Sequence, residues 1–117
     1  MAQHNETGSA GEKLGVEWLI KQGFTIKAVN WRYRHLEVDI IATKKDTLHF
    51  IEVKTRTTTL YGNPEESITR AKMQNLKDAA EQYQHLHPGW KWIQIDVLAI
   101  LFKSGKVDYW FNQDVYW

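Results

Sequence analysis

The chain contains no cysteine, only two prolines and no long apolar segment. Without cysteine it forms neither disulfide bonds nor thiolate metal sites, which is typical of a protein from a reducing compartment. The longest apolar run, Val97 to Phe102, is far shorter than the roughly 18 residues that a membrane-spanning helix needs. The polar beginning, MAQHNETGSAGEK, lacks the apolar core of a signal peptide. We therefore expect a soluble, cytoplasmic protein with no membrane partner.

The composition is that of an ordinary globular domain. Of the 117 residues, 43% are hydrophobic and 25% are charged, which excludes disordered, collagen-like and low-complexity chains. A chain of this size buries about two thirds of its unfolded surface, which is enough for one core. Since no repeat or linker-like stretch divides the sequence, we predict a single domain over residues 1–117.

The formal net charge of +1 conceals a basic middle segment. Residues 21–77 carry 11 basic and 6 acidic side chains, whereas both flanking segments are net acidic. Such an excess is typical of proteins that bind the phosphate backbone of nucleic acids, although many solvated protein faces share it. The charge pattern alone therefore makes a nucleic acid one candidate partner.

Hydrophobic periodicity predicts the element order α-β-β-β-α-β-β. The first helix is expected to begin near Ser9, because Ser9-Ala10-Gly11-Glu12 fits a capping box, and to end at Gly23. A second helix, starting at Asn63 or at Thr69, is expected to end at the His87-Pro88-Gly89 segment. The expected strands cover residues 24–34, 36–43, 48–55, 90–102 and 107–111. Together they predict an α/β fold with one mixed sheet flanked by helices.

Charged residues interrupt two of the predicted strands. Glu37 and Asp39 are two residues apart on one strand, and Glu52 and Lys54 are two residues apart on the next. Because side chains alternate along a strand, each pair points to a single face. Whether both pairs share that face depends on the register of the hairpin.

Two registers of this hairpin are open. In the first, Thr43 pairs with Leu48. Asp39 then stands opposite Glu52, and all four charged side chains line one face. In the second, Asp39 pairs with Ile51, and the two charged pairs point to opposite faces. We favour the first, because its reverse face is almost wholly apolar, formed by Leu36, Val38, Ile40, Ala42, His49, Ile51, Val53 and Thr55.

Opposed carboxylates repel each other unless a cation lies between them. Mg²⁺ takes oxygen ligands and commonly uses one or two protein carboxylates, so Asp39 and Glu52 suit it, with Mn²⁺ as a substitute. Lys54 would add a positive charge that orients a water molecule or meets a phosphate oxygen. Two carboxylates, a divalent cation and a lysine together are suited to the hydrolysis of a phosphodiester. The alternative is a half-exposed hairpin whose charges form cross-strand pairs.

Arginine side chains near these strands are candidates for contact with a nucleic-acid backbone. They are Arg32, Arg34, Arg56 and Arg70. Trp31 and Tyr33, which alternate with two of them, could stack on an unpaired base if their rings are exposed. The alternative is an edge strand whose arginines lie over apolar neighbours.

These residues carry a resemblance to a known family. The blocks that match are Gly11-Glu12, Glu37 to Ala42, Phe50 to Arg56, Gly62 to Glu66, Lys72 and Ile95 to Val97. From about Asn5 to Ile100 the chain resembles the bacterial YraN-like family. That uncharacterised family is assigned to the PD-(D/E)XK, or restriction-endonuclease-like, nuclease superfamily, close to archaeal Holliday-junction resolvases. The resemblance implies a metal-dependent endonuclease acting on DNA, branched or junction DNA included.

The resemblance also implies roles for the residues of the hairpin. Asp39 and Glu52 look like the two acidic metal ligands, and Lys54 looks like the lysine that positions the attacking water. Val53 would lend its backbone carbonyl to the metal. The sequence departs from the superfamily's named motif at Val38, where that motif has proline.

Two helical residues match as well. Glu12 resembles a helix-borne glutamate directed at the same metal, although a glutamate in a first turn is also a common capping partner. Lys72 resembles a basic residue on the second helix that faces the site. Both would bring side chains from outside the hairpin to its carboxylates.

Other roles stay open at the level of sequence. A nucleic-acid-binding module could keep this architecture without catalysis. A protein-interaction domain could instead use the aromatic C-terminal residues, among them Trp110 and Trp117, as the seam of a homodimer. Asp96 lies in an apolar strand, so it is expected to be structural and to need a partner if buried.

Overall fold

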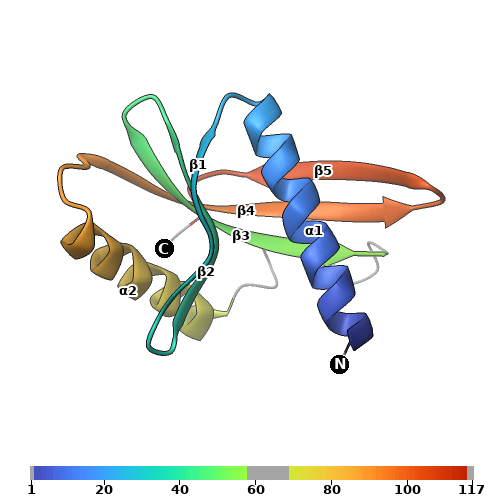
Figure 1. The fold of residues 1–117 in the computed structure, drawn as a ribbon, viewed down its shortest axis with the longest axis horizontal. Coiled ribbons are helices and arrows are strands. Elements are labelled where there is room, and N and C mark those ends of the chain that lie inside the picture. The colour runs from blue at the N-terminus through green and yellow to red at the C-terminus, as the bar shows by residue number, and fades with distance from the viewer. Residues whose placement is uncertain (1, 58–68, 116–117) are drawn as a thin grey trace.

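The computed structural model of the chain describes residues 2–57 and 69–115, with side chains from residue 10 onward. It confirms the predicted α/β fold and the order α-β-β-β-α-β-β. The elements are α1 (Ala2–Lys21), β1 (Thr25–Tyr33), β2 (Leu36–Lys44), β3 (Thr47–Arg56), α2 (Arg70–Leu86), β4 (Trp92–Lys103) and β5 (Lys106–Asn112). In Figure 1, α1 crosses in front of the sheet and the β4–β5 hairpin extends past it.

The strands form a mixed five-stranded sheet in the order β1-β2-β3-β4-β5. β1, β2 and β3 are antiparallel neighbours, as their short connections require. β4 lies parallel to β3, because α2 carries the chain back across the sheet between them. β5 returns antiparallel through a tight turn in which Ser104 and Gly105 both have positive φ.

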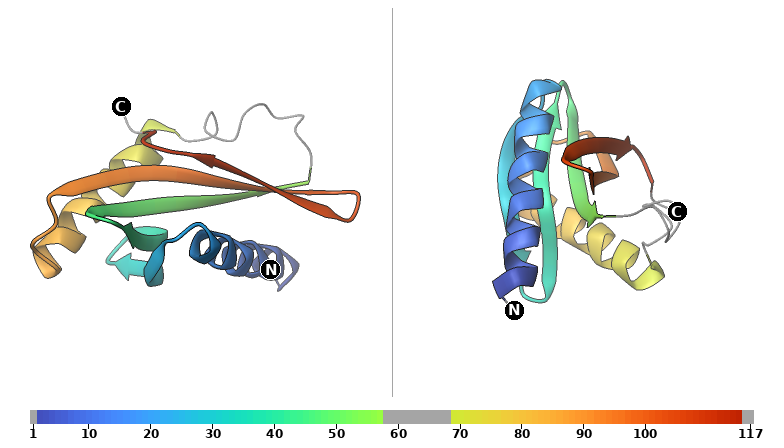
Figure 2. Two further views of the ribbon diagram at one scale, coloured as in Figure 1. Left: turned by 90° about the horizontal axis from the view of Figure 1, so that it is seen from above. Right: turned by 90° about the vertical axis from the view of Figure 1, so that its right-hand side faces the viewer.

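The helices lie on opposite faces of the sheet, as the right-hand view in Figure 2 shows. The apolar cluster on the α2 side includes Phe50 of β3 and Met73 of α2. The cluster on the α1 side includes Ile51 of β3 and Leu19 of α1. Since consecutive side chains of β3 pack in different clusters, this strand is buried on both faces and lies at the centre of the molecule.

The first helix begins earlier than predicted, at Ala2 rather than near Ser9. Ser9 and Glu12 therefore lie inside α1, and the expected capping box is wrong. Residues three apart are neighbours on a helix surface in its interior as well as at its start. The spacing of a serine and a glutamate thus does not by itself locate a helix terminus.

The end of α1 agrees with the prediction. Gly23 has a φ of 97°, a left-handed conformation that glycine adopts without steric cost. The N–H of Phe24 donates to the carbonyl of Leu19 at 3.0 Å, and the N–H of Gly23 donates to that of Ile20 at 3.0 Å. These two bonds form a Schellman motif. They turn the chain so that Phe24 packs with Leu19 in the same cluster.

The second helix uses the later of its two expected starts. Thr69 is the N-cap of α2, and its side-chain oxygen accepts a hydrogen bond from the N–H of Lys72 at 3.1 Å. The alternative start, Asn63, lies outside the described residues. The helix is capped at its other end by His87, within the segment where the sequence predicted termination.

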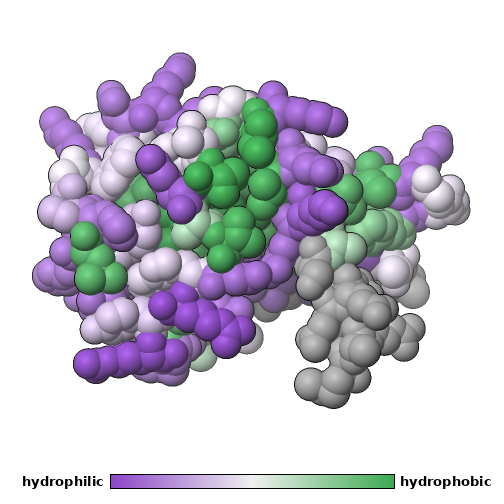
Figure 3. Space-filling model, viewed as in Figure 1, coloured by the Kyte–Doolittle hydropathy of each residue, from purple (hydrophilic) through white to green (hydrophobic). Residues whose placement is uncertain are grey.

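Polar side chains dominate the face drawn in Figure 3, and the largest apolar area lies near α1 and β1. Exposed apolar residues of these two elements include Ile20 and Val29. Among the helices within residues 2–57 and 69–115, none combines the length and the apolar character needed to cross a bilayer.

Candidate functional site

The β2–β3 hairpin adopts the register that the apolar pattern favoured. Thr43 pairs with Leu48, and the ladder continues only as far as Ile40. Asp39 and Glu52 are the next residues on their strands, so they face each other where the ladder ends. The predicted register is therefore confirmed, and Asp39 and Glu52 are close enough for the charge of Glu52 to raise the pKa of Asp39.

The reverse face is not the single apolar surface that strict alternation predicted. Leu36 and Val38 pack in the cluster on the α2 side, whereas Ile40 and Ala42 pack in the cluster on the α1 side. The alternation changes at Asp39, where β2 stops pairing with β3. Beyond that point β2 stays paired only with β1, and its twist turns the earlier side chains toward α2. Figure 1 shows the strong curvature of these two strands.

Glu52 is almost completely buried, with 4% of its surface exposed. Its Oε2 atom lies 3.4 Å from Nζ of Lys54 and 3.2 Å from Nζ of Lys72. Its Oε1 atom is buried and has no hydrogen-bond partner among the described residues. An unpaired buried carboxylate oxygen is energetically costly, so Oε1 is the atom of this site most in need of a ligand.

Asp39 is held against β3 by a backbone hydrogen bond. The N–H of Val53 donates to Asp39 Oδ2 at 2.8 Å. Burial, together with the nearby charges of Glu52 and Glu12, raises the pKa of Asp39 from 3.8 to about 7, while the Val53 hydrogen bond and Lys72 act in the opposite direction. A cation placed between the carboxylates would relieve this repulsion.

The backbone N–H of Val53 indicates the side to which its carbonyl points, while the metal-ligand role of that carbonyl stays a prediction. Within a strand, the N–H and C=O of one residue point to the same side. Because the N–H of Val53 faces Asp39, its carbonyl oxygen faces the gap between β2 and β3 as well. The site thus presents carboxylate and carbonyl oxygens, the donor types that Mg²⁺ and Mn²⁺ accept.

Glu12 approaches the same carboxylates from α1. Its Oε1 atom accepts a hydrogen bond from Nδ2 of Asn30 at 3.0 Å, and its charge is close enough to raise the pKa of Asp39. The helix packs tightly here, because a Cβ atom on Gly11 would collide with Cγ2 of Thr55. Within the described part of the chain, no three His, Asp or Glu side chains are arranged to hold an ion. A ligand role for Glu12 therefore stays a prediction.

Three of the predicted basic residues lie on the elements that form the site. Lys72 extends from α2 to Glu52, as the resemblance implied. Arg56 follows Lys54 by two positions on β3, so it points to the same face. Its Nη1 atom donates to the carbonyl of Thr55 at 2.9 Å. Arg70 is the first residue of α2 and is exposed.

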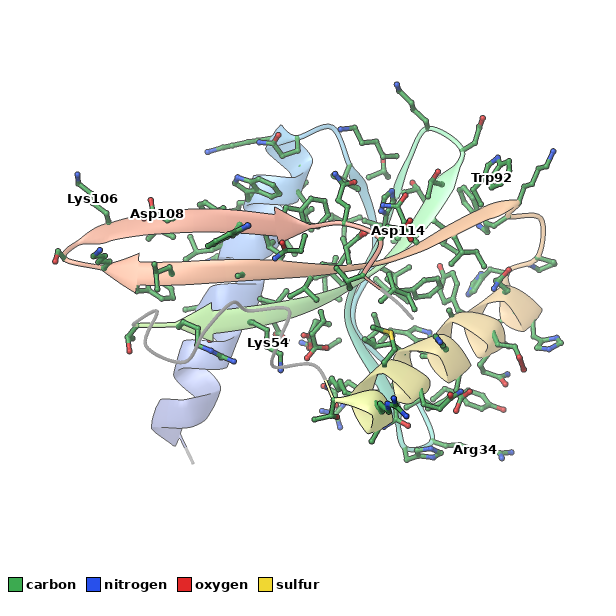
Figure 4. The ribbon with its side chains drawn as sticks, turned by 180° about the vertical axis from the view of Figure 1, so that it is seen from behind. Arg34, Lys54, Trp92, Lys106, Asp108 and Asp114 are labelled. Atoms are coloured by element: carbon green, nitrogen blue, oxygen red, sulfur yellow. The ribbon has the colours of Figure 1, made fainter. Side chains whose placement is uncertain are left out.

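The remaining two predicted basic residues lie elsewhere, in the β1–β2 hairpin. Nη2 of Arg32 is 3.6 Å from the carboxylate of Glu37, and the guanidinium of Arg34 lies 5.4 Å from the ring centre of Tyr33. Figure 4 shows Arg34 at the tip of this hairpin, well separated from Lys54. The structure therefore does not bring these arginines, or Glu37, to the paired carboxylates.

Asp96 is structural, as expected from its apolar surroundings. It is fully buried, and its Oδ2 atom lies 2.6 Å from Nδ1 of His49. Its Oδ1 atom accepts hydrogen bonds from the N–H of Asp114 at 2.9 Å and from Gln94 at 3.1 Å. These contacts connect β3, β4 and the segment after β5.

Sequence reasoning missed Asn30 as a partner of Glu12. Asn30 has a φ of 54° within β1, a left-handed conformation that asparagine tolerates better than most residues. An asparagine inside a run of strand-forming residues was the available signal. Its contact with α1 depends on tertiary packing, which the local pattern does not report.

Comparison with known sequences places the chain in a family. The profile of UPF0102, described as an uncharacterised protein family, matches residues 11–100. A UPF0102 protein of Bacteroides thetaiotaomicron is 38% identical over 106 residues, covering 91% of this chain and 88% of the relative. One of Flavobacterium psychrophilum is 39% identical over 106 residues, with coverage of 91% and 88%. One of Dictyoglomus thermophilum is 41% identical over 109 residues and covers 92% of both chains. The chain belongs to the family UPF0102, which confirms the predicted YraN-like membership.

Proposed function

We propose that this protein is a metal-dependent endonuclease that hydrolyses phosphodiester bonds in DNA. The observation that carries the proposal is the meeting of Asp39, Glu52 and Lys54 where the β2–β3 ladder ends, with one buried carboxylate oxygen unpartnered. The resemblance to PD-(D/E)XK nucleases supports the same reading. It also favours branched or junction DNA as the substrate, a cytoplasmic location, and a homodimer presenting two such sites.

The residues present fit a divalent cation. Glu52 Oε1 lacks a partner and the pKa of Asp39 is raised in part by the charge of Glu52, so the site has both a free ligand atom and a repulsion to relieve. Asp39, Glu52 and the carbonyl of Val53 would hold Mg²⁺ or Mn²⁺, with Glu12 as a further candidate ligand. Such an ion, when bound, supplies Lewis-acid polarisation of a phosphate group.

Lys54 is positioned to act on the water or on the phosphate. Its ammonium group carries three N–H donors, and the contact with Glu52 at 3.4 Å uses only part of them. The remaining donors are available to orient an attacking water or to stabilise the charge that develops on a phosphate oxygen. Its position is restricted, because Glu52 is buried and holds the ammonium from one side.

Lys72 would bind the DNA backbone beside this centre. Its side chain is 40% exposed while its ammonium contacts Glu52, so it lies between the buried carboxylate and the solvent. Arg56 and Arg70 lie on the same two elements as Lys54 and Lys72, and they would add positive charge for contact with phosphates.

The test is cleavage of labelled single-stranded, duplex, flap and four-way-junction DNA with Mg²⁺ or Mn²⁺. We expect Asp39→Asn and Lys54→Met to reduce cleavage by at least about 100-fold, the range typical of removing one catalytic group. Glu37→Gln is the matched control, because it removes an exposed carboxylate from the same strand. Wild-type cleavage by the Asp39→Asn protein, or failure of the wild-type protein to cleave any of these substrates, would contradict the proposal.

A non-catalytic nucleic-acid-binding module is the second candidate. The observation in its favour is that Lys54 and Lys72 both contact Glu52 Oε2 and so compensate the charge of that carboxylate. Titration calorimetry with Mn²⁺ separates the two functions. Saturable heat that disappears in Asp39→Asn supports the nuclease, whereas DNA binding without such heat supports the module.

A further inference from the structure

The strand registers place an exposed tryptophan on the same face as the candidate site. Lys54 of β3 pairs with Ala99 of β4, and Ala99 pairs with Trp110 of β5. Laterally paired residues point to the same face of a sheet, so these three side chains form a row. Because neighbouring strands are about 4.8 Å apart, Trp110 lies about 10 Å across the sheet from Lys54.

Packing of the neighbouring residues agrees with this assignment. Tyr109 and Phe111, on either side of Trp110, pack against the α1-side cluster and against the ring of Trp18. Trp110 must therefore point away from α1, and it is 53% exposed. Figure 4 looks onto this face, where α2 covers one end of the sheet and the β4–β5 hairpin extends beyond it.

The charged side chains on this face between the candidate site and the hairpin tip are mostly cations, with one carboxylate, Asp108, which pairs with Leu101. Arg56 neighbours Lys54 on β3, and Lys103 pairs with Lys106 where β4 turns into β5. Lys103 is four residues beyond Ala99 on the same strand, which is about 13 Å and keeps the same orientation. The exposed ring thus lies on a face where the cations Lys54, Arg56, Lys103 and Lys106 outnumber Asp108.

We propose that Trp110 is a stacking platform for an unpaired nucleobase, so that the substrate of the candidate site contains unpaired nucleotides next to the cleaved phosphodiester. This inference rests on the proposed function. Cationic side chains that follow the backbone, combined with an exposed aromatic ring, are the features that bind single strands. A base inside a duplex has both faces covered by its neighbours and offers none to the ring. A span of about 10 Å corresponds to about three stacked nucleotides at 3.4 Å each.

An exposed ring on an edge strand could instead contact a second copy of the chain. The charges on this face oppose that arrangement, because Asp108 can compensate only one of Lys103 and Lys106 in each copy, which leaves an excess of positive charge to be desolvated between the two copies. A polyanionic strand meets the same cations favourably. The observations therefore favour nucleic acid over self-association.

The experiment measures fluorescence anisotropy of labelled oligothymidine and of a covalently closed duplex, both in EDTA so that no cleavage occurs. We expect Trp110→Ala to weaken single-strand binding about 10-fold, within the range of one base stacking on an aromatic ring, and to leave duplex binding unchanged. Trp110→Phe should retain most of the affinity. Trp92→Ala is the matched control, because Trp92 is 57% exposed at the opposite end of β4.

Equal weakening of both DNAs, no effect of Trp110→Ala, or the same effect from Trp92→Ala would each overturn the inference. So would a loss of self-association in sedimentation velocity with unchanged DNA binding, since this result assigns the ring to a protein interface. Absence of cleavage by the wild-type protein, with Trp110-dependent single-strand binding intact, contradicts the proposed nuclease but supports the stacking platform. Normal cleavage together with normal single-strand binding by Trp110→Ala supports the proposed nuclease and contradicts the stacking platform.

Discussion

Nζ of Lys72 lies 3.2 Å from Oε2 of Glu52, so a side chain from α2 contacts a buried carboxylate on β3. The N-cap at Thr69 starts α2 at a position that puts Lys72 in its first turn, close to this strand. The contact makes α2 part of the candidate site rather than only a cover for the sheet. Removing the ammonium group of Lys72 therefore tests whether α2 takes part in function.

Replacing Lys72 by Met should weaken DNA binding and reduce cleavage by about 10-fold or more, because a phosphate contact and part of the charge compensation of Glu52 are lost. The free energy of unfolding should change by only about 1 kcal/mol, since this pair is partly exposed and Lys54 still contacts Glu52. Anisotropy and urea unfolding measure the two effects. Lys27→Met, which removes an exposed lysine from β1, controls for general charge, and an equal loss from it would contradict a specific role.

The raised pKa of Asp39 predicts a pH-dependent stability. The unfolded chain ionises this group near pH 4 and the folded chain only near pH 7. Folding therefore loses stability as the pH rises from about 4 to 7, and the loss is complete above pH 7. Asp39→Asn removes this penalty, so it should be more stable than the wild type above pH 7, by at most about 4 kcal/mol, and similar to it near pH 4. Urea unfolding from pH 4 to 9 measures the difference, and parallel curves for the two proteins would contradict it.

Divalent cations should stabilise the folded protein, because they bind the assembled oxygen ligands and not the unfolded chain. At a Mn²⁺ concentration of 100 times Kd the gain is about 2.7 kcal/mol, measured as a saturable rise in Tm. The rise should be lost in Asp39→Asn and Glu52→Gln and kept in Glu37→Gln. The same rise in all three variants would show that the ion binds elsewhere.

Gly11→Ala should destabilise the fold by about 1–3 kcal/mol, because the added methyl group collides with Cγ2 of Thr55 and overpacking at such a contact carries this cost. Helix propensity acts in the other direction, since alanine is favoured over glycine in a helix interior by about 1 kcal/mol. Thr55→Ser removes the colliding atom. In that background Gly11→Ala should become neutral or stabilising, and thermal unfolding of the double-mutant cycle measures the change.

The Gly11→Ala variant also tests whether the close approach of α1 to the sheet is needed to bring Glu12 near Asp39. If α1 is displaced by Gly11→Ala, the charge of Glu12 moves relative to Asp39, and any metal-dependent cleavage should fall with the stability. Recovery of cleavage in the Thr55→Ser background is the expected result. Recovered stability without recovered cleavage would contradict a role for the close approach of α1.

The register of the hairpin was predictable because a strand has a period of two. Only the pairing of Thr43 with Leu48 buries the apolar positions near the turn and leaves Asp39 opposite Glu52. Prediction failed at Leu36 and Val38, where β2 leaves β3 and twists. Strict alternation of side chains between two faces assumes that a strand pairs with the same neighbour along its whole length. β2 pairs with β3 along only part of its length.

The sequence by itself determined the order of the elements, the mixed sheet and the adjacency of the acidic pair, since these follow from local periodicity and short connections. Only the tertiary structure decided that Lys72 and Glu12 approach these carboxylates, that burial and mutual repulsion raise the pKa of Asp39, and that Trp110 shares a face with Lys54. The physical reason is distance along the chain. These relations require a helix crossover and the parallel pairing of β3 with β4, which join segments that no local pattern relates.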